Sequence, residues 1–274
     1  YKYLLQLQEP REIEDEMTAS TFGTVVHKVL ENGLKKLTTN PLHRSDLVRL
    51  KNDVSALLET SVASAFNLSL TESGENFLHF AMAEATVNKL IDVEIQELDG
   101  TLHRHVQSLE KSLAHTFETD HPTFSLVRLK GEADRIDLEN GTCVVTDYKT
   151  GNVSSNELTL KGDWTEVLAK GKAGKALQLL IYAAIALETL GPNDSSIPEV
   201  QLGIRSGKNA KVGLLSLTID GRREITREDS RKLLNWLISQ LETHGGDTPN
   251  VDHNEEAIYC NYCTVLDPPI TYFK

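Results

Sequence analysis

The sequence has few cysteines and no long apolar run. Three cysteines among 274 residues cannot form a disulfide framework, and there is no basic-then-apolar leader, so we expect a cytoplasmic protein. The longest apolar run, from Leu177 to Leu187, is interrupted by Gln178 and falls short of the about 18 residues that a membrane span needs. We therefore expect no membrane partner.

The sequence also has fewer basic than acidic residues. The chain has 28 Lys and Arg against 40 Asp and Glu, a formal net charge of −12. This balance argues against a protein held on nucleic acid by bulk charge, although a local basic groove remains possible. With 39% apolar and 25% charged residues, the composition is that of a globular protein. The chain begins with Tyr1 rather than Met, which suggests a piece of something longer.

Hydrophobic periodicity divides the chain near residue 120. The first 120 residues are predicted to be helical, and strands and helices alternate after that point, which indicates a central sheet flanked by helices. The predicted helices cover residues 20–37, 45–66, 73–98, 102–113, 175–190 and 226–243. The predicted strands cover residues 123–138, 142–149, 200–205 and 212–219.

Asn140 and Gly141 form the strongest hairpin signal in the chain. If they are the two central residues of a type I′ turn, the register places Asp134 opposite Asp147. Two like charges so close together destabilise a sheet unless a cation lies between them. Mg²⁺ or Mn²⁺ would serve, because both prefer carboxylate oxygens. Lys149 follows on the same face, so a metal, an activated water and an ammonium would meet, as cleavage of a phosphodiester requires.

A plainer interpretation of this hairpin remains open. Asp147-x-Lys149 can arise by chance in an ordinary strand with solvated side chains, and short motifs often match falsely. A bulge would also move Asp134 to the other face of the strand.

Two helical pairs spaced four residues apart are candidate supports for this site. Gly23 would let another backbone approach closely, and His27 could ligate the metal, although a packed histidine is the plainer alternative. Gln178 and Tyr182 lie on an otherwise apolar helix and should contact the substrate or the metal-binding strand, unless they form a surface stripe. A loop with four lysines could follow a polyanion or be merely solvated: Lys161, Lys170, Lys172 and Lys175.

Together these residues resemble the RecB/AddB branch of the PD-(D/E)XK nuclease superfamily. The motifs occur in the order Gly23-x-x-x-His27, Gly131-x-x-Asp134, Asp147-Tyr148-Lys149 and Gln178-x-x-x-Tyr182. The opening segment is most similar to the start of the nuclease domain that ends AddB-type helicase–nuclease subunits.

The resemblance implies a restriction-endonuclease-like α/β fold, a mixed sheet flanked by helices with a large N-terminal helical portion. Residues 1–120 would carry the GxxxH helix, and residues 121–274 would form the nuclease core and C-terminal tail of the same structural unit. The implied activity is metal-dependent hydrolysis of DNA in double-strand break repair, with a helicase domain or subunit as partner.

The resemblance also assigns the site. His27, Asp134, Asp147 and the main-chain carbonyl of Tyr148 would bind Mg²⁺ or Mn²⁺. Lys149 would position the attacking water or stabilise the transition state. Gln178 and Tyr182 would shape the site and contact DNA, and Glu132 is a possible additional site residue.

The cysteines depart from the pattern of this branch, whose members often bind an iron–sulfur cluster through four of them. Cys260 and Cys263 match two of the last three, but no cysteine precedes His27 and the remaining one, Cys143, lies in the hairpin. We therefore expect no cluster. The alternative to a nuclease is a catalytically silent module of the same fold that binds DNA or a helicase partner.

Overall fold

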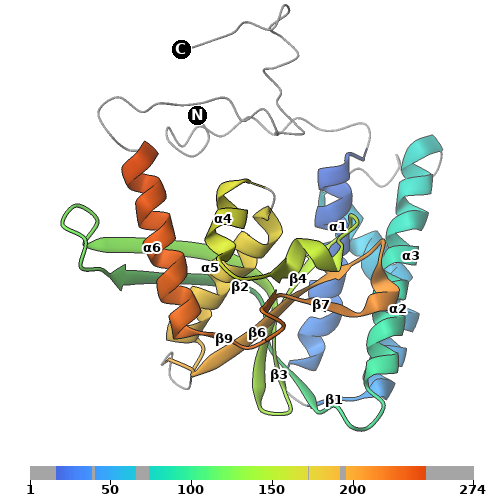
Figure 1. The fold of residues 1–274 in the computed structure, drawn as a ribbon. Helices are drawn as coiled ribbons and strands as arrows, with labels where there is room; N and C mark the ends of the chain where they lie inside the picture. The colour runs from blue at the N-terminus through green and yellow to red at the C-terminus, as the bar shows by residue number, and fades with distance from the viewer. Residues whose placement is uncertain (1–16, 39–40, 66–73, 172, 192–195, 245–274) are drawn as a thin grey trace, which may run out of the picture.

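The computed structural model describes residues 17–38, 41–65, 74–171, 173–191 and 196–244 (Figure 1). Its helices are α1 (Ala19–Leu34), α2 (Arg44–Ala65), α3 (Gly74–Glu97), α4 (Trp164–Ala169), α5 (Gly174–Thr189) and α6 (Arg227–His244). Its strands are β1 (Pro41–Leu42), β2 (Arg104–Glu118), β3 (Leu126–Glu139), β4 (Thr142–Lys149), β5 (Thr159–Leu160), β6 (Glu199–Ser206), β7 (Leu214–Ser216), β8 (Thr218–Ile219) and β9 (Ile225–Thr226). Short 3₁₀ turns are η1 (Lys35–Leu37), η3 (Ser155–Leu158) and η5 (Ala210–Val212).

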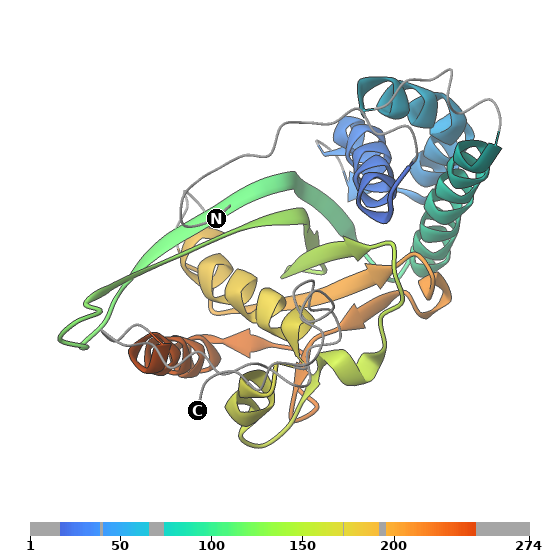
Figure 2. The same cartoon turned by 90° about the horizontal axis from the view of Figure 1, so that it is seen from above.

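The main sheet is mixed. Its strand order is β1-β2-β3-β4-β6-β7, with β9 paired to β6, and β5 and β8 pair separately. Strands β4 and β6 are parallel, whereas β2, β3 and β4 form an antiparallel meander. Helices flank this sheet on both sides (Figures 1 and 2). The expected α/β architecture is therefore confirmed and is consistent with a restriction-endonuclease-like fold.

The N-terminal helices form a layer on the sheet and not a large separate helical portion. Helices α1, α2 and α3 share one apolar core with Val106 of β2 and Tyr148 of β4. Helix α5 packs on the other side of the sheet, where Ile136 and Val145 join its buried residues. Each of the two cores therefore contains residues of the sheet, so the strands between them are held from both sides.

Strand β2 corrects the prediction of a helix at residues 102–113. The apolar residues Val106, Leu109, Leu113 and Phe117 recur at helical spacing, but the segment pairs with β3 over almost its whole length. The register shifts between Val106 and Ser108, and Glu110 has a positive φ of 46°. These irregularities change the phase of the strand, so that Val106 and Leu109, three residues apart, both face the core of α1–α3, whereas Leu113, four residues after Leu109, faces that of α5.

The β3–β4 hairpin confirms the predicted turn. Asn140 and Gly141 both have positive φ, of 48° and 91°, as a type I′ turn requires, and Glu139 pairs with Thr142. The paired residues end at Arg135 and Thr146. The ladder therefore stops one pair before Asp134 and Asp147.

Buried ion pairs fix helix α3 to the sheet. Both carboxylate oxygens of Glu94 accept hydrogen bonds from Nη1 of Arg135, at 3.0 and 2.9 Å, and Nη1 of Arg104 lies 3.1 Å from Glu94 Oε2. The hydroxyl of Tyr148 also accepts from Arg135, at 3.1 Å. We call this group the arginine cluster, and its members are Glu94, Glu97, Arg104, Arg135, Asp137 and Arg205.

Candidate active site

Helix α1 carries His27 to the sheet. Thr18 caps the helix by accepting a hydrogen bond from the N–H of Thr21 (3.2 Å). The buried side chains of Val26 and Val29 hold the helix against its neighbours. Nε2 of His27 lies 2.9 Å from the carbonyl oxygen of Tyr148. The predicted histidine therefore contacts the strand that carries Asp147 and Lys149, which goes beyond a packing role.

Gly23 lies one turn before His27 and lines the same open pocket. A Cβ added at Gly23 would have Oγ1 of Thr150 as its nearest neighbour, at 3.8 Å, which is ordinary van der Waals contact. The expected close approach of another backbone is therefore wrong. The glycine instead leaves space in a pocket whose other lining residues include Ser20, Thr24, Lys28, Glu31, Glu110 and Lys149.

Asp134 is a buried residue that connects β3 to both β4 and α1. Its Oδ2 accepts a 2.6 Å hydrogen bond from the N–H of Tyr148, and its Oδ1 lies 3.5 Å from Nδ1 of His27. Both contacts arise where the β3–β4 ladder ends, because a strand that leaves its partner frees main-chain groups for side chains. The main chain of Tyr148 thereby joins Asp134 and His27.

Strand β2 adds Glu110, a carboxylate that the sequence analysis missed. Glu110, His27 and Asp134 each offer a ligand atom, and these atoms lie within 4.8 Å of one another. Glu110 has a φ of 46°, in the left-handed region that non-glycine residues rarely adopt. Such strain is characteristic of functional sites. No sequence signal marked this residue, because the strand around it resembled a helix.

The charges of this group perturb one another. Burial and then the nearby charge of Asp134 raise the pKa of Glu110 to about 7. Burial alone would lower the pKa of His27, but the hydrogen bond and charge of Asp134 outweigh it and raise this pKa above its ordinary value. Two carboxylates and an imidazole this close favour a shared cation, either a proton or a metal.

Asp147 lies beside Lys149 and Gln178. Its Oδ1 accepts from Nζ of Lys149 at 3.1 Å and from Nε2 of Gln178 at 3.0 Å. Its Oδ2 lies 2.9 Å from Nζ of Lys149. Because that contact lacks hydrogen-bond geometry, the buried Oδ2 has no hydrogen-bond partner within the described residues. Burial raises the pKa of Asp147, while the charge of Lys149 opposes that rise.

The β3–β4 ladder has the predicted register, and Asp134 and Asp147 lie one position beyond its last pair, Arg135 and Thr146. The two carboxylates still interact, since the charge of Asp134 adds to the rise in the pKa of Asp147 that burial causes. Within the described part of the chain, ligand atoms of His27, Glu110 and Asp134 lie close enough together to share one ion. Asp147 instead contacts Lys149 and Gln178, at the side of that group.

Gln178 and Tyr182 both point from α5 to the strands that carry the acids. Nε2 of Gln178 donates to the hydroxyl of Tyr182 at 2.7 Å as well as to Asp147. The ring of Tyr182 lies against Gly131, where an added Cβ would be 2.4 Å from Cε1 of the tyrosine. The pair is therefore not a surface stripe, and Gly131 is the glycine that a close approach requires.

The remaining predicted residues lie at the margins. Glu132 is exposed, and its charge contributes to the raised pKa of Glu110. Lys175 pairs with Glu157, and Lys161 and Lys170 are exposed. Lys172 lies outside the described residues.

Of the cysteines, only Cys143 falls within the described part of the chain, where it is a free thiol and partly buried. Burial raises the pKa of its thiol to about 11, which keeps it protonated. Cys260 and Cys263 lie outside the described residues, so the expectation of no iron–sulfur cluster stays a prediction.

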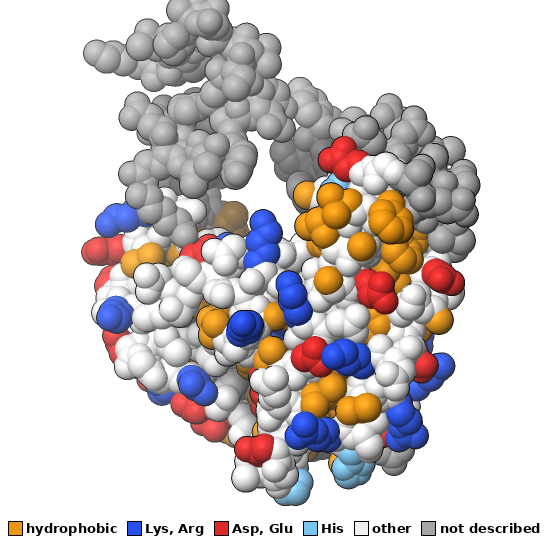
Figure 3. Space-filling model, turned by 90° about the vertical axis from the view of Figure 1, so that its right-hand side faces the viewer, with side chains coloured by type: hydrophobic (Ala, Val, Ile, Leu, Met, Phe, Trp, Pro, Cys, Tyr) orange, Lys and Arg blue, Asp and Glu red, His pale blue; other side chains and the backbone are white. Residues whose placement is uncertain are grey.

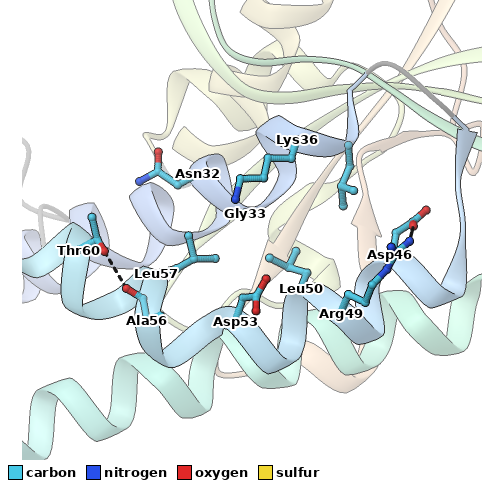
Figure 4. Close-up of a pocket in the computed structure, with 11 residues that line it drawn as sticks. Asn32, Gly33, Lys36, Asp46, Arg49, Leu50, Asp53, Ala56, Leu57 and Thr60 are labelled. Atoms are coloured by element: carbon cyan, nitrogen blue, oxygen red, sulfur yellow. Dashed lines mark hydrogen bonds and ion pairs between the residues drawn. The ribbon is translucent and has the colours of Figure 1, made fainter.

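Two other surface features contain none of the predicted site residues. A pocket between α1 and α2 has Leu50 and Leu57 among its lining residues, together with charged Lys36 and Asp53 (Figure 4). Apolar side chains gather over the outer side of α3 (Figure 3). The large exposed ones there are Phe77, Leu78 and Met82.

Comparison with known proteins gives a match to a protein family. The family described as the PD-(D/E)XK nuclease superfamily matches residues 1–267. An uncharacterized protein of Rickettsia bellii (strain RML369-C) is 25% identical over 161 residues, which are 57% of this chain and 17% of that protein. The chain thus spans about a sixth of that relative's length. No solved structure matches the chain significantly. No helix in the described ranges is long and apolar enough to cross a membrane.

Proposed function

The chain belongs to the PD-(D/E)XK nuclease superfamily, and we propose that it is a divalent-metal-dependent deoxyribonuclease that hydrolyses phosphodiester bonds. The proposal rests on the proximity of His27, Glu110 and Asp134. These residues lie beside Tyr148 and Lys149. Nucleases of this superfamily generally use a divalent metal, so the site should contain residues that can bind one.

The residues present fit a hard divalent ion. Carboxylate oxygens are the ligands that Mg²⁺ and Mn²⁺ prefer, and imidazole suits Mn²⁺ as well. We propose that His27, Glu110 and Asp134 hold the ion, with the carbonyl of Tyr148 as a further oxygen donor. The buried Oδ2 of Asp147 lacks a hydrogen bond in the described part of the chain, which supports a role for Asp147 as an additional ligand.

When bound, the metal would supply Lewis-acid activation of the phosphate and of a water molecule. Lys149 holds an ammonium beside Asp147, where it can position the attacking water and stabilise negative charge that develops on phosphate oxygens. Gln178 donates to Asp147 and so fixes the orientation of that carboxylate. Tyr182 accepts from Gln178 and orients the amide in turn, so both act by positioning, and we propose that they also contact DNA.

We further propose that the chain acts as the nuclease domain of a RecB/AddB-like helicase–nuclease in double-strand break repair. The order of the GxxxH, GxxD, DYK and QxxxY motifs supports this context. The match to a stretch that is 17% of a longer relative agrees with a domain that occurs within a longer chain. DNA and a helicase domain or subunit would be its partners.

The alternative is a catalytically silent module of the same fold. The net charge of −12 favours it, because such a charge hinders binding of DNA across the whole surface. The grouped acids disfavour it, since close carboxylates without a bound ion only destabilise the fold.

The proposal is tested by incubating the protein with single- and double-stranded DNA in Mg²⁺ or Mn²⁺. We expect cleavage by the native chain and a loss of about 100-fold or more in Asp147→Asn and Lys149→Met, with unchanged thermal stability. If the native protein leaves both DNAs intact and Mn²⁺ does not raise its Tm, the silent module is the correct interpretation.

A further inference from the structure

The half of the β2–β3 hairpin nearest its turn, residues 112–118 and 126–132, has one buried face and one exposed face. Leu113, Phe117 and Val127 are buried in the core that contains α5. Because successive side chains of a strand point to opposite sides, their neighbours point away from α5. All of these neighbours are exposed. We call them the hairpin face, and its members are Ser112, Ala114, Thr116, Glu118, Leu126, Arg128, Lys130 and Glu132.

In the middle of the hairpin face, between its acids Glu118 and Glu132, cations on β3 lie beside small residues on β2. Lys130 pairs with Ala114, and Arg128 pairs with Thr116. The small residues leave room above β2, so an extended polymer lying there would have both cations along one side. Within the described residues, Arg128 and Lys130 have no ion-pair partner, although the protein as a whole is acidic. Two cations held exposed without partners are available to an anionic ligand.

The spacing of these cations suits a polyanion. Residues two apart on a strand are about 6.6 Å apart along it, which is of the order of the distance between neighbouring phosphates in an extended nucleic-acid strand. Arginine and lysine are the usual partners of backbone phosphates. Arg128 and Lys130 are therefore placed to bind two consecutive phosphates.

The hairpin face leads into the candidate active site. Lys130 is four residues before Asp134 on β3, about 13 Å along the strand, and Ser112 is two residues after Glu110 on β2. Figure 2 shows the hairpin running from the region of α1 away from the helices α1–α3. Glu132, between Lys130 and Asp134, marks where the cationic part ends and the acidic, ion-binding part begins.

We propose that the hairpin face guides a single DNA strand to the active site by binding its phosphates through Arg128 and Lys130. The inference rests on the proposed function, because it takes DNA as the substrate. A single strand fits because the face is only two β-strands wide and its contacts lie in one row along β3. The binding is to the backbone and carries no sequence preference.

The test is binding of a fluorescent 20-nucleotide DNA strand without metal. Binding is measured by fluorescence anisotropy in EDTA at several salt concentrations. We expect the full chain carrying Arg128→Glu and Lys130→Glu to bind about tenfold more weakly at low salt. The slope of log K against log salt should fall by about 1.4, because each phosphate contact to a single strand contributes about 0.7. The charge-preserving variant Arg128→Lys with Lys130→Arg should bind like the native chain.

The matched control reverses two exposed cations elsewhere, Lys35→Glu with Lys89→Glu, which changes net charge equally. An equal loss in this control would assign the effect to bulk charge and overturn the proposal. A loss seen only with a duplex of the same length would overturn the choice of a single strand.

A small phosphodiester separates this proposal from the proposed function. Bis(p-nitrophenyl) phosphate is too short to reach Arg128 or Lys130, so with Mn²⁺ the Arg128→Glu, Lys130→Glu variant should hydrolyse it at the native rate. A lower rate in this variant would show that the cations act at the reacting centre and would overturn the guiding role. If the native chain hydrolyses neither this compound nor DNA, the nuclease proposal fails, while the EDTA binding data still decide whether the hairpin face holds the strand.

Discussion

The N–H of Tyr148 donates a 2.6 Å hydrogen bond to Oδ2 of Asp134. The carbonyl of the same residue lies 2.9 Å from Nε2 of His27. A single residue of β4 thus links an acid of β3 to a histidine of α1 through its main chain. Main-chain groups make both links, so the side chain of Tyr148 takes no direct part in them.

Asp134→Asn should separate chemistry from folding. The amide oxygen of asparagine can still accept from the N–H of Tyr148, but the charge is lost, so cleavage of DNA in Mn²⁺ should fall by about 10³-fold with little change in Tm. Asp134→Ala removes the acceptor as well and should cost a further 1–3 kcal/mol or so of unfolding free energy. Cleavage assays and thermal unfolding measure the two effects. Native activity in Asp134→Asn would exclude Asp134 from the site.

Glu110→Gln should weaken metal binding more than Glu132→Gln does. Glu110 offers an oxygen within 4.8 Å of ligand atoms of His27 and Asp134, whereas Glu132 is exposed outside that group. Isothermal titration with Mn²⁺ should give a dissociation constant about tenfold or more higher for the first variant and a change below about twofold for the second. Equal effects of the two substitutions would contradict the assignment of Glu110.

Gly131→Ala and Gly23→Ala form a matched pair. At Gly131 the new Cβ would lie 2.4 Å from the ring of Tyr182, so overpacking should lower the unfolding free energy by about 1–3 kcal/mol. At Gly23 the nearest atom is 3.8 Å away, and alanine in a helix should stabilise by about 0.5–1 kcal/mol. Urea unfolding compares them. A destabilised Gly23→Ala would show that the helix is more tightly packed there than the structure indicates.

Glu94 should make the free energy of unfolding depend on pH in the acid range. Burial would raise the pKa of Glu94, but Arg135, Arg205 and Arg104 lower it from its ordinary value of 4.5 to about 2. A carboxyl with a lowered folded pKa stabilises fully above its unfolded pKa and loses that contribution as pH falls. Native stability should therefore drop between about pH 4.5 and about pH 2.

Glu94→Gln is the corresponding variant. At pH 7 it should be about 3–5 kcal/mol less stable, because buried arginines lose their counter-charge. Its stability should also change less between pH 4.5 and pH 2, as followed by urea unfolding at each pH. An unchanged acid profile would mean that other carboxylates control it.

The hairpin of β3 and β4 was predictable because its turn is local. Asn140 and Gly141 specify positive φ at two consecutive positions, and that choice sets the register. The ladder keeps this register as far as Arg135 and Thr146, one pair before Asp134 and Asp147. Whether the strands stay paired at Asp134 depends on β2 and α1, which are distant in sequence.

Strand β2 was missed because two irregularities disguise its period. A register shift near Val106 and the left-handed Glu110 interrupt the alternation of β2, so that its apolar residues recur at helical spacing. Glu110 was missed with it, whereas His27, Asp134, Asp147 and Lys149 were predicted from motifs. The sequence therefore indicated most of the site residues but not which of them gather around one point.

Tyr148 belongs to two assemblies at once. Its main chain holds His27 and Asp134, and its hydroxyl accepts from Arg135 in the arginine cluster that fixes α3. The candidate active site and the attachment of α3 to the sheet thus depend on the position of one residue, Tyr148. Local unfolding that detaches α3 from the sheet would therefore also displace the main-chain groups of Tyr148 that contact His27 and Asp134.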